Sequence, residues 1–366
     1  MNITTIIGAR PQFIKAIMVN LAIAEYNRTL GGTQIKETLI HTGQHYDQNM
    51  SEIFFRELKI PRPSVNLGVG SGNHGETTGR MLAGIEKELI SNPPDLVLVL
   101  GDTNSTLAGS LAASKLKIPV AHVESGLRSF NKKMPEEINR ILTDHISDIL
   151  FCPTETAVTN LCNEGIVKGV YNVGDVMYDA ANFFGDIAEE KSKIMHLYNL
   201  MPERYALATV HRAENTDDDI TLSNIMEGLS SIGRTYYPVI FPLHPRTRKA
   251  LKRIGYSISK GKTRDNITFL EPVSFLDMIM LEKSAKCILT DSGGVQKEAY
   301  FHGVPCITLR KETEWTETVE SGWNQLVGSD VANIMMAVNC AKKGKEIKLY
   351  GDGNSGQKII QCLINT

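Results

Sequence analysis

The chain has 366 residues, of which 42% are hydrophobic, and one hydrophobic core rarely accommodates so long a chain, so two domains are expected. Lys and Arg number 39 against 41 Asp and Glu, which leaves a formal net charge of -2. This balance excludes a general basic field for nucleic acid or an anionic membrane, so an anionic ligand has to meet a local site. The sequence also predicts neither a secretion signal nor a membrane span.

Short apolar runs rich in β-formers alternate with longer segments of helical period. The predicted strands are 4–7, 38–41, 96–100, 120–123, 149–151 and 170–173 in the first half, and 206–210, 239–241, 267–269, 287–289, 306–308 and 326–327 in the second. Continuous apolar strands between amphipathic helices are typical of parallel sheets covered on both faces. The fold class is therefore α/β, with two doubly wound, Rossmann-like domains.

The predicted domains are residues 1–172 and residues 173–353, with a boundary near Asn172–Asp179. Residues 354–366 form a short amphipathic helix that we expect to cross back and pack at the domain junction. Six cysteines are scattered without CxxC or Cys/His ligand spacing: Cys152, Cys162, Cys287, Cys306, Cys340 and Cys362. This pattern favours reduced, buried thiols in a cytoplasmic protein over disulfides or a zinc site.

The first strand is followed by Gly8-Ala9-Arg10-Pro11-Gln12-Phe13-Ile14-Lys15. Gly8 suits a tight turn from strand to helix, and Pro11 suits the first turn of the helix. Arg10 and Lys15 place two cations near a helix N-terminus, where backbone N–H groups already attract anions. The segment predicts a diphosphate site, or else only a tight turn with solvated charges. It is neither GxGxxG nor a Walker loop, which disfavours a bound dinucleotide or an ATPase.

Two further predicted strands end in acids. Asp102 follows the strand 96–100, where it is a candidate catalytic residue and also a candidate N-cap of the next helix. Glu124 ends the strand 120–123, with Gly126 and Arg128 nearby. An apolar strand end is an unfavourable place for a carboxylate unless a partner compensates it.

A third acidic position lies in Met134-Pro135-Glu136-Glu137-Ile138-Asn139-Arg140, which predicts a helix start at Pro135. The helix macrodipole alone would explain two acids in the first turn. Since consecutive helical residues point in different directions, at most one of the pair is expected to share a site with Glu124. Carboxylates gathered in one site would raise one another's pKa, as acid–base chemistry near neutral pH requires.

In the second half, His211-Arg212 and His244-Pro245-Arg246 each follow a predicted strand. Two strand-terminal His-Arg sets in one domain favour anion binding over purely structural histidines. Zinc ligation is disfavoured, because the acids and histidines lack a helical i, i+4 pairing.

The strongest single signal is Thr290-Asp291-Ser292-Gly293-Gly294-Val295-Gln296-Lys297-Glu298-Ala299. A turn formed by Ser292, Gly293 and Gly294 that runs into a helix presents free backbone N–H groups and a hydroxyl to a phosphate. Glu298 lies one helical turn further on, where it can accept hydrogen bonds from a ribose diol. The segment therefore predicts a nucleotide-sugar site.

Together these motifs resemble the non-hydrolysing UDP-N-acetylglucosamine 2-epimerase family over nearly the whole length of the chain. GARPQFIK, GDTNST, HVESGLRS, MPEEINR, VHRAEN, HPRT and DSGGVQKEA all occur in the family's order. The resemblance implies two Rossmann-like domains that face a cleft, as in the B-type glycosyltransferases. It also implies a homodimer, and a UDP-sugar as the substrate, with no cofactor and no metal.

The resemblance assigns roles residue by residue. Arg10 and Lys15 match nucleotide-site positions, and the HPRT match covers His244. The catalytic group corresponds to Asp102, Glu124, Glu136 and His211, and the diphosphate and ribose contacts to Ser292, Gly293, Gly294 and Glu298. One carboxylate would remove the C2 proton while UDP leaves C1, which gives a 2-acetamidoglucal, and the fragments would recombine with a proton on the opposite face. Arginines and His211 would stabilise the departing UDP.

One position departs from the family's common Thr-Glu-Arg-Pro-Glu. Here Thr313-Glu314-Trp315-Thr316-Glu317 replaces a planar cation with an indole. This variant resembles the branch that acts on UDP-2,3-diacetamido-2,3-dideoxyglucuronate for surface polysaccharides. Both that sugar and UDP-N-acetylglucosamine remain candidate substrates, and activation by substrate stays undecided.

Three alternatives stay open. A glycosyltransferase of the same fold would need an acceptor site and one base, whereas a hydrolysing 2-epimerase would release UDP irreversibly. A catalytically inactive nucleotide-sugar sensor is disfavoured, because each expected acid–base position carries a competent residue.

Overall fold

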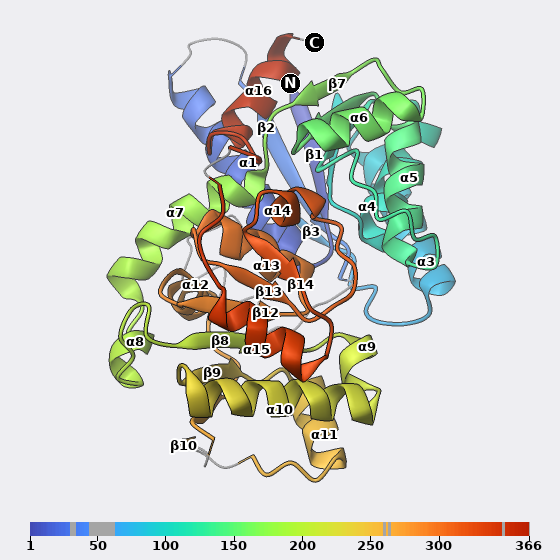
Figure 1. The fold of residues 1–366 in the computed structure, drawn as a ribbon. Coiled ribbons are helices and arrows are strands. Elements are labelled where there is room, and N and C mark those ends of the chain that lie inside the picture. The colour runs from blue at the N-terminus through green and yellow to red at the C-terminus, as the bar shows by residue number, and fades with distance from the viewer. Residues whose placement is uncertain (30–33, 44–62, 259–260, 263–264, 346–347, 366) are drawn as a thin grey trace. The chain divides into compact units, whose positions relative to one another are not determined.

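A computed structural model describes residues 1–29, 34–43, 63–258, 261–262, 265–345 and 348–365, which form two compact units (Figure 1). Unit 1 comprises Met1–Ala180 with Lys348–Thr366, and unit 2 comprises Ala181–Ile347. The sequence analysis divided the chain at residues 172 and 353. Residues 174–180 instead belong with the C-terminal segment, because Asp175 N–H donates to Tyr350 O at 3.0 Å and Gly356 N–H donates to Asp179 Oδ2 at 2.8 Å.

Unit 1 contains a parallel sheet whose described strands follow the order β3-β2-β1-β4-β5-β6-β7. The strands are β1 (Asn2–Ile7), β2 (Lys36–His41), β3 (Val65–Asn66), β4 (Leu96–Leu100), β5 (Val120–Val123), β6 (Ile149–Cys152) and β7 (Val170–Asn172). The helices are α1 (Arg10–Thr29), α3 (His74–Ser91), α4 (Asn104–Lys115), α5 (Pro135–Ile146), α6 (Glu155–Asn163), α7 (Val176–Lys191), which continues into unit 2, and α16 (Ser355–Asn365).

Alternate residues of the unit 1 strands pack on different helices. Ile6, Ile40, Val97 and Val99 form one core cluster with apolar residues of α3 and α4. Helices α1 and α16 pack against each other on the other side of the sheet, so the last helix returns to the first unit (Figure 1). A Cβ at Gly356 would lie 2.8 Å from Met18 O, which shows how closely these two helices approach.

Unit 2 repeats the arrangement, with the described strands in the order β10-β11-β9-β8-β12-β13-β14. The strands are β8 (Ala206–Thr209), β9 (Val239–Pro242), β10 (Gly261–Lys262), β11 (Ile267–Leu270), β12 (Cys287–Thr290), β13 (Cys306–Thr308) and β14 (Asn324–Leu326). The helices are α8 (Ile194–Leu197), α9 (Ala213–Thr216), α10 (Asp219–Thr235), α11 (Pro245–Arg253), α12 (Phe275–Lys283), α13 (Gly293–Phe301), α14 (Thr316–Glu320) and α15 (Val331–Asn339).

Two core clusters cover the two faces of the unit 2 sheet. Ala206, Ala208 and Leu289 face α10, α11 and α15, whereas Leu207 and Ile288 face α8, α12 and α13. This alternation within continuous apolar strands confirms the predicted doubly wound α/β fold. The prediction missed two short edge strands, β3 and β10, of which β10 pairs antiparallel with β11.

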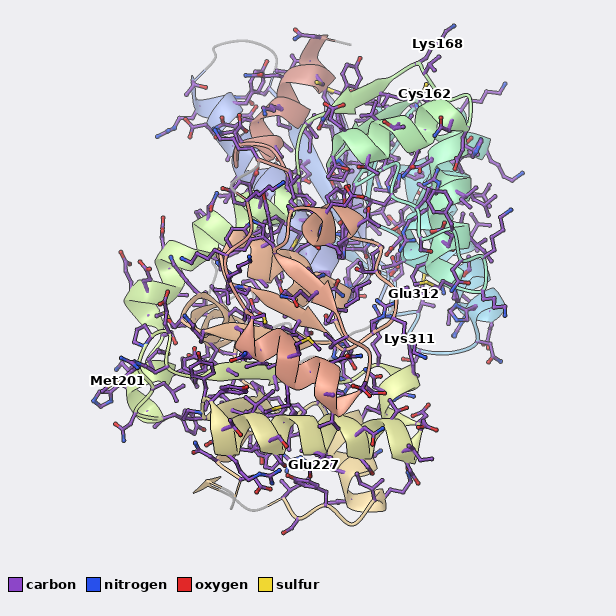
Figure 2. All side chains as sticks on the ribbon, in the orientation of Figure 1. Cys162, Lys168, Met201, Glu227, Lys311 and Glu312 are labelled. Atoms are coloured by element: carbon purple, nitrogen blue, oxygen red, sulfur yellow. The ribbon has the colours of Figure 1, made fainter. Side chains whose placement is uncertain are left out.

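The cysteines are less uniformly buried than predicted. Cys152, Cys287 and Cys306 are buried, but Cys162 and Cys340 are exposed, and none of the six forms a disulfide. Figure 2 shows Cys162 on the outer side of α6. The described helices include none that is both long and apolar enough to cross a membrane.

Candidate functional site

Each sheet has one topological switch point, where the strand order reverses direction. In unit 1 it lies between β1 and β4, and in unit 2 between β8 and β12. Ligands of doubly wound sheets bind beyond the carboxyl ends of the strands at such points. Lys15 follows β1, Asp102 follows β4, His211 follows β8 and Ser292 follows β12, whereas Glu124 and His244 follow the neighbouring strands β5 and β9. Each unit therefore has its own candidate site, called its half-site below.

The turn after β1 is tied to the turn after β4 by Gln12. Its side-chain oxygen accepts from Gly8 N–H and Ala9 N–H at 2.8 and 3.0 Å, and its amide donates to Leu100 O at 2.6 Å. A Cβ at Gly8 would collide with the hydroxyls of Thr42 and Ser105. Glycine is therefore required at position 8, and the two strand ends are held as one unit.

Of the two predicted cations of this segment, the structure describes the side chain of Lys15. Arg10 begins α1, but its side chain lies outside the described part of the structure. The Lys15 side chain is 10% exposed and pairs with Glu124, whose side chain is 8% exposed. Lys15 is thus the compensating partner that an acid at the end of a buried strand requires.

Two unusual backbone conformations occur directly after β4 and β5. Glu124 has φ +73° and Gly101 has φ +63°, and both values lie in the left-handed region. A Cβ at Gly101 would lie 3.2 Å from Lys15 Nζ and 3.3 Å from Glu124 Oε2. The Lys15–Glu124 pair therefore lies against the residue that precedes Asp102.

The structural alternative for Asp102, as an N-cap, is wrong. Thr103 caps α4, because its hydroxyl accepts from Thr106 N–H. Asp102 instead accepts from Arg140 Nε at 3.0 Å, and Asn139 Nδ2 donates to Asp102 O at 2.9 Å. The carboxylate is therefore free of a capping role and is oriented by the guanidinium of Arg140.

The two adjacent acids of α5 differ, as the helical geometry predicts. Glu137 is 1% exposed and accepts from Ser129 N–H, Phe130 N–H and Arg140. Burial acts to raise the pKa of Glu137, but the bonds from Ser129 and Phe130 and the charge of Arg140 lower it overall. Glu136 is partly exposed and forms no hydrogen bond or ion pair within the described residues. Glu137 is thus structural, and Glu136 keeps a carboxylate available to a ligand.

In unit 2, helix α13 begins with an open N-terminus. Ser292 occupies the N-cap position without a side-chain capping bond, and its N–H donates to Thr290 Oγ1 at 2.9 Å. A Cβ at Gly293 would collide with Glu314, whereas a Cβ at Gly294 would meet only Ser292 Oγ at 3.9 Å. The first N–H groups of the helix and the Ser292 hydroxyl form an anion-binding arrangement.

His211 follows β8 on the other side of the switch point and is positioned by Asp291. The Asp291 side chain is fully buried, and its carboxylate accepts from the N–H groups of His211 and Arg212 and from Asn215 Nδ2, all at 3.0 Å. Asp291 Oδ1 lies 3.6 Å from His211 Nδ1, beyond hydrogen-bond distance.

His244 caps α11 and lies beside His211, with ring centroids 5.4 Å apart. Burial, then His244, Arg212 and Arg246, lowers the pKa of His211, although Asp291 opposes this shift. Burial and Arg246 likewise lower the pKa of His244. Both rings are neutral at pH 7 and can gain a proton when an anion arrives.

Glu298 lies on α13, one turn after the glycines. It faces a second acid, Glu282 of α12, whose side chain is 1% exposed. Burial, then the charge of Glu298, raises the pKa of Glu282. The raised pKa favours the protonated form of Glu282 near neutral pH.

Trp315 lies against the same helix start. Its side chain packs beside Gly293, because a Cβ there would be 3.4 Å from Trp315 Nε1. Lys297 Nζ lies 4.1 Å above the centroid of the indole ring. The backbone N–H of Trp315 donates to Thr313 Oγ1 at 3.2 Å. The residue that departs from the family pattern is therefore part of the unit 2 half-site.

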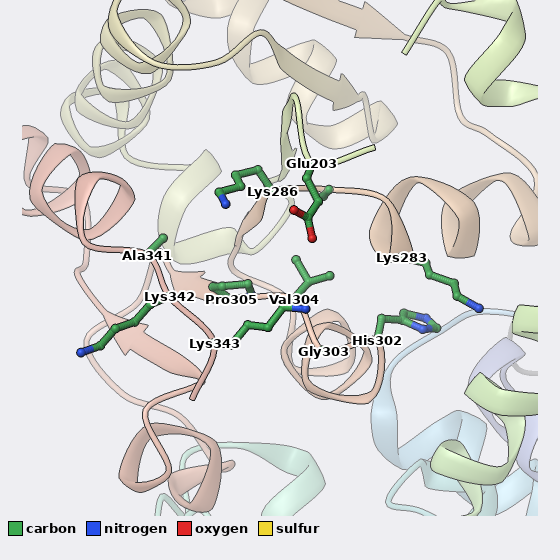
Figure 3. Close-up of a pocket in the computed structure, with 11 residues that line it drawn as sticks. Glu203, Lys283, Lys286, His302, Gly303, Val304, Pro305, Ala341, Lys342 and Lys343 are labelled. Atoms are coloured by element: carbon green, nitrogen blue, oxygen red, sulfur yellow. The ribbon is translucent and has the colours of Figure 1, made fainter. Parts of the chain in front are cut away.

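A separate cavity of about 80 Å³ opens near the amino ends of β12 and β13. Its lining includes Lys283, Lys286, Lys342 and Glu203, but Figure 3 shows Lys283 and Lys342 pointing away from the centre, toward which Glu203 points. The cations do not converge on a common point, and the cavity lies at the end of the sheet opposite the predicted site residues.

The sequence analysis missed the residues that position the expected site. Arg140 orients Asp102, and Asp291 orients the His211 turn. Both partnerships join segments at least 38 residues apart, so no local pattern indicates them. Two local signals were present in the sequence: Glu124 ends an apolar strand and requires a cation, and Asp291 stands directly before the Ser292-Gly293-Gly294 turn.

Comparison with known proteins finds relatives over the length of the chain. The sequence model of the family described as UDP-N-acetylglucosamine 2-epimerase matches residues 28–364. A UDP-N-acetylglucosamine 2-epimerase homolog of Methanococcus maripaludis is 54% identical, with 100% of each chain covered. The UDP-2,3-diacetamido-2,3-dideoxy-D-glucuronate 2-epimerase of Pseudomonas aeruginosa is 49% identical, with 99% of each chain covered.

The fold is similarly matched by solved structures. The Methanocaldococcus jannaschii UDP-GlcNAc 2-epimerase in complex with UDP-GlcNAc and UDP superposes with a TM-score of 0.89 at 48% identity, covering 100% of both chains. The Neisseria meningitidis UDP-GlcNAc 2-epimerase bound to UDP-GlcNAc gives a TM-score of 0.87 at 30% identity, again over 100% of both chains.

Proposed function

Since the chain belongs to the UDP-N-acetylglucosamine 2-epimerase family, we propose that it inverts C2 of a UDP-activated N-acetylamino sugar without net hydrolysis. The observation that carries the proposal is the pair of carboxylates at adjoining strand ends of unit 1. Glu124 lies against Gly101, the residue before Asp102, and each acid has its own cationic partner. Two separately held carboxylates suit a reaction that removes a proton from one face and returns it to the other.

The proposed reaction has two balanced steps. A carboxylate takes the C2 proton, the C–H electron pair forms the C1=C2 bond, and the C1–O bond breaks with its electrons going to UDP. In the second step a UDP oxygen attacks C1, and the C1=C2 electron pair takes a proton at C2 from a carboxylic acid on the opposite face. Proton exchange with water then returns both acids to their starting states. The acids proposed for these transfers are Asp102, Glu124 and Glu136, and no external oxidant, metal or cofactor enters the balance.

Unit 2 supplies the proposed nucleotide contacts. The N–H groups at Gly293 and Gly294 and the Ser292 hydroxyl bind the diphosphate, and Glu298 accepts from the ribose. His211 and His244 stabilise the leaving UDP, since a bound diphosphate favours protonation of rings that are neutral without it. Arg10 and Lys15 complete the nucleotide-site set from the family pattern, although Lys15 also holds Glu124.

Two substrate pairs are proposed, UDP-N-acetylglucosamine with UDP-N-acetylmannosamine and the equivalent pair of UDP-2,3-diacetamido uronates. Relatives whose names specify each chemistry are 48% and 49% identical to this chain, so overall identity does not separate them. Trp315, in place of the family's arginine, favours the uronate. Parallel assays of the two UDP-sugars, followed by NMR for inversion at C2, identify the substrate by the larger kcat/KM.

Deuterated water tests the reaction itself. The proposal requires deuterium at C2 of both epimers and a stable total of UDP-sugar over time. A glycosyltransferase gives no exchange at C2 without an acceptor, and a hydrolysing 2-epimerase releases free N-acetylmannosamine and UDP. Absence of deuterium at C2 with either UDP-sugar rejects the epimerase.

The family resemblance also supports three proposals about context. We propose that the protein is a homodimer, that it works in the cytoplasm and that its product enters surface polysaccharide synthesis. Sedimentation equilibrium tests the first, and loss of surface polysaccharide on deletion of the gene tests the last. A monomer, or unaltered polysaccharide, contradicts the respective proposal.

A further inference from the structure

His122 lies on β5, two residues before Glu124, and its side chain is fully buried. Nδ1 lies 2.7 Å from Asp144 Oδ1, and Nε2 lies 2.8 Å from Gly101 O. A backbone carbonyl oxygen accepts hydrogen bonds and never donates them. Nε2 therefore carries a hydrogen, and the state of Nδ1 depends on Asp144.

Asp144 is held as a carboxylate, so it too is an acceptor. Its other oxygen accepts from Gly126 N–H at 3.1 Å and from Arg128 Nη1 at 2.7 Å. Burial would raise the pKa of Asp144, but the bonds and charges of His122 and Arg128 lower it overall. With an acceptor at each ring nitrogen, both nitrogens of His122 have to donate.

The charges around His122 balance when its ring is cationic. Arg128 also donates to both oxygens of Glu164 at 2.7 Å, and Glu164 lies 3.3 Å from His145. Counted with the imidazolium, His122 and Arg128 supply two positive charges against the two carboxylates of Asp144 and Glu164. The cluster, in which His122, Arg128 and Asp144 are buried and Glu164 is exposed, is therefore neutral overall, which reduces the penalty against a charged histidine in the core.

The second acceptor of His122 connects this cluster to the candidate acids. Gly101 has φ +63° and precedes Asp102, and its N–H donates to Val123 O at 3.0 Å. The bond from Nε2 fixes the carbonyl of the same residue, and so the peptide plane that leads into Asp102. Gly101 is also the residue against which the Lys15–Glu124 pair lies. The His122 side chain thus fixes the residue that precedes Asp102 and that lies beside the Lys15–Glu124 pair.

We propose that His122, donating from both ring nitrogens, acts as a positioning residue for proton transfer at C2 by clamping the Gly101 carbonyl. The proposal rests on the proposed epimerase function for its kinetic part only. It predicts that activity depends on the Nε2 bond to Gly101 more than on the Nδ1 bond to Asp144.

Two substitutions separate these bonds. His122→Gln can place an amide N–H where Nε2 was and keep the bond to Gly101 O, whereas His122→Asn can place one where Nδ1 was and keep the bond to Asp144. We expect kcat to fall about 100-fold in His122→Asn and about 10-fold or less in His122→Gln, in the range of catalytic positioning effects. The KM for the UDP-sugar and the Kd for UDP should stay within about threefold in both.

A purely structural role gives a different pattern, in which kcat follows thermal stability and is equal in variants of equal Tm. Equal kcat in the two variants, or a lower kcat in His122→Gln, overturns the positioning role. The charge is tested without substrate by ¹⁵N-histidine NMR of the wild-type protein at pH 7.5, with His122→Gln used for assignment. Two protonated ring nitrogens support the imidazolium, and one protonated nitrogen refutes it even if the protein proves to have no epimerase activity.

Discussion

The two units differ in how they bury several of their ionisable groups. In unit 1, Lys15 is buried with Glu124 and Arg128 with Asp144, as oppositely charged pairs. In unit 2 the burial of His211 and His302 lowers their pKa, and the burial of Glu282 raises its pKa, so each favours its neutral form. Unit 1 therefore has its electrostatic field in place before substrate arrives, whereas the unit 2 half-site gains charge with the diphosphate.

The largest effect is expected where a unit 1 pair is broken. Glu124→Gln should lower kcat about 10³-fold, about 4 kcal/mol in activation free energy, because it removes an acid–base group. It should also destabilise the protein, since Lys15 is left buried without its counter-charge. Turnover is measured by deuterium incorporation at C2, and stability by urea denaturation.

The double variant Lys15→Met/Glu124→Gln separates these two losses. Removing both charges should restore much of the stability while activity stays low. The exposed Glu86→Gln of α3 is the control and should match wild type. Turnover close to wild type in Glu124→Gln would remove Glu124 from the proposed catalytic group.

The next largest effect is expected at His302 of unit 2, whose buried side chain favours its neutral form. Burial, then Lys283, lowers the pKa of His302 from 6.5 to about 4. Between these values the unfolded chain binds a proton that the folded chain does not, so stability is lost as pH falls from 6.5 toward 4. The loss attributable to this group is about 3 kcal/mol.

His302→Gln should flatten the acid side of the stability profile, measured by urea denaturation from pH 7.5 to 4.5. His302 Nε2 lies 4.0 Å from Glu282 Oε2. The raised pKa of Glu282 adds stability as the pH falls and so opposes the loss caused by His302, but Glu282 is present in both wild type and His302→Gln. The exposed His196→Gln of α8 is the matched control. Parallel profiles for wild type and His302→Gln would show that His302 does not stay neutral in the fold.

Features of this protein that depend on neighbouring residues could be predicted from the sequence, whereas contacts between residues far apart in the chain could not. The strands β4, β5 and β12 were predictable because continuous apolar runs report burial on both faces, and Gly8 was predictable from the turn it permits. The roles of Glu137 and Thr103 were not predictable. Glu136 beside Glu137, and Asp102 beside Thr103, could fill the same role by their chemistry, and the sequence does not show which side chain points toward the partner. Arg140, Asp291 and Asp144 act across 16 to 80 residues, and such pairings exist only once the sheet order is fixed.

In unit 2, Asp291 is fully buried and serves as an acceptor for the turn after β8. Asp291→Asn places an amide NH₂ against the donors at His211, Arg212 and Asn215, and we expect the Kd for UDP to rise about 30-fold, about 2 kcal/mol. Isothermal titration with UDP measures this, and the exposed Asp219→Asn serves as the control. If UDP affinity is unchanged, the turn after β8 takes no part in nucleotide binding.

The smallest effect is expected at Trp315, a buried residue that lies beside Gly293 at the start of α13. Trp315→Arg restores the family's cation but places it near Lys297, whose Nζ lies 4.1 Å from the indole centroid. We expect the ratio of kcat/KM for UDP-N-acetylglucosamine over the diacetamido uronate to rise about fivefold, about 1 kcal/mol, because the change is in one contact beside Gly293. Trp315→Phe keeps the ring above which Lys297 lies and should leave the ratio within twofold of wild type. An equal change in both variants would assign the effect to lost packing at α13, and an unchanged ratio in Trp315→Arg would show that sugar choice is set elsewhere in the chain.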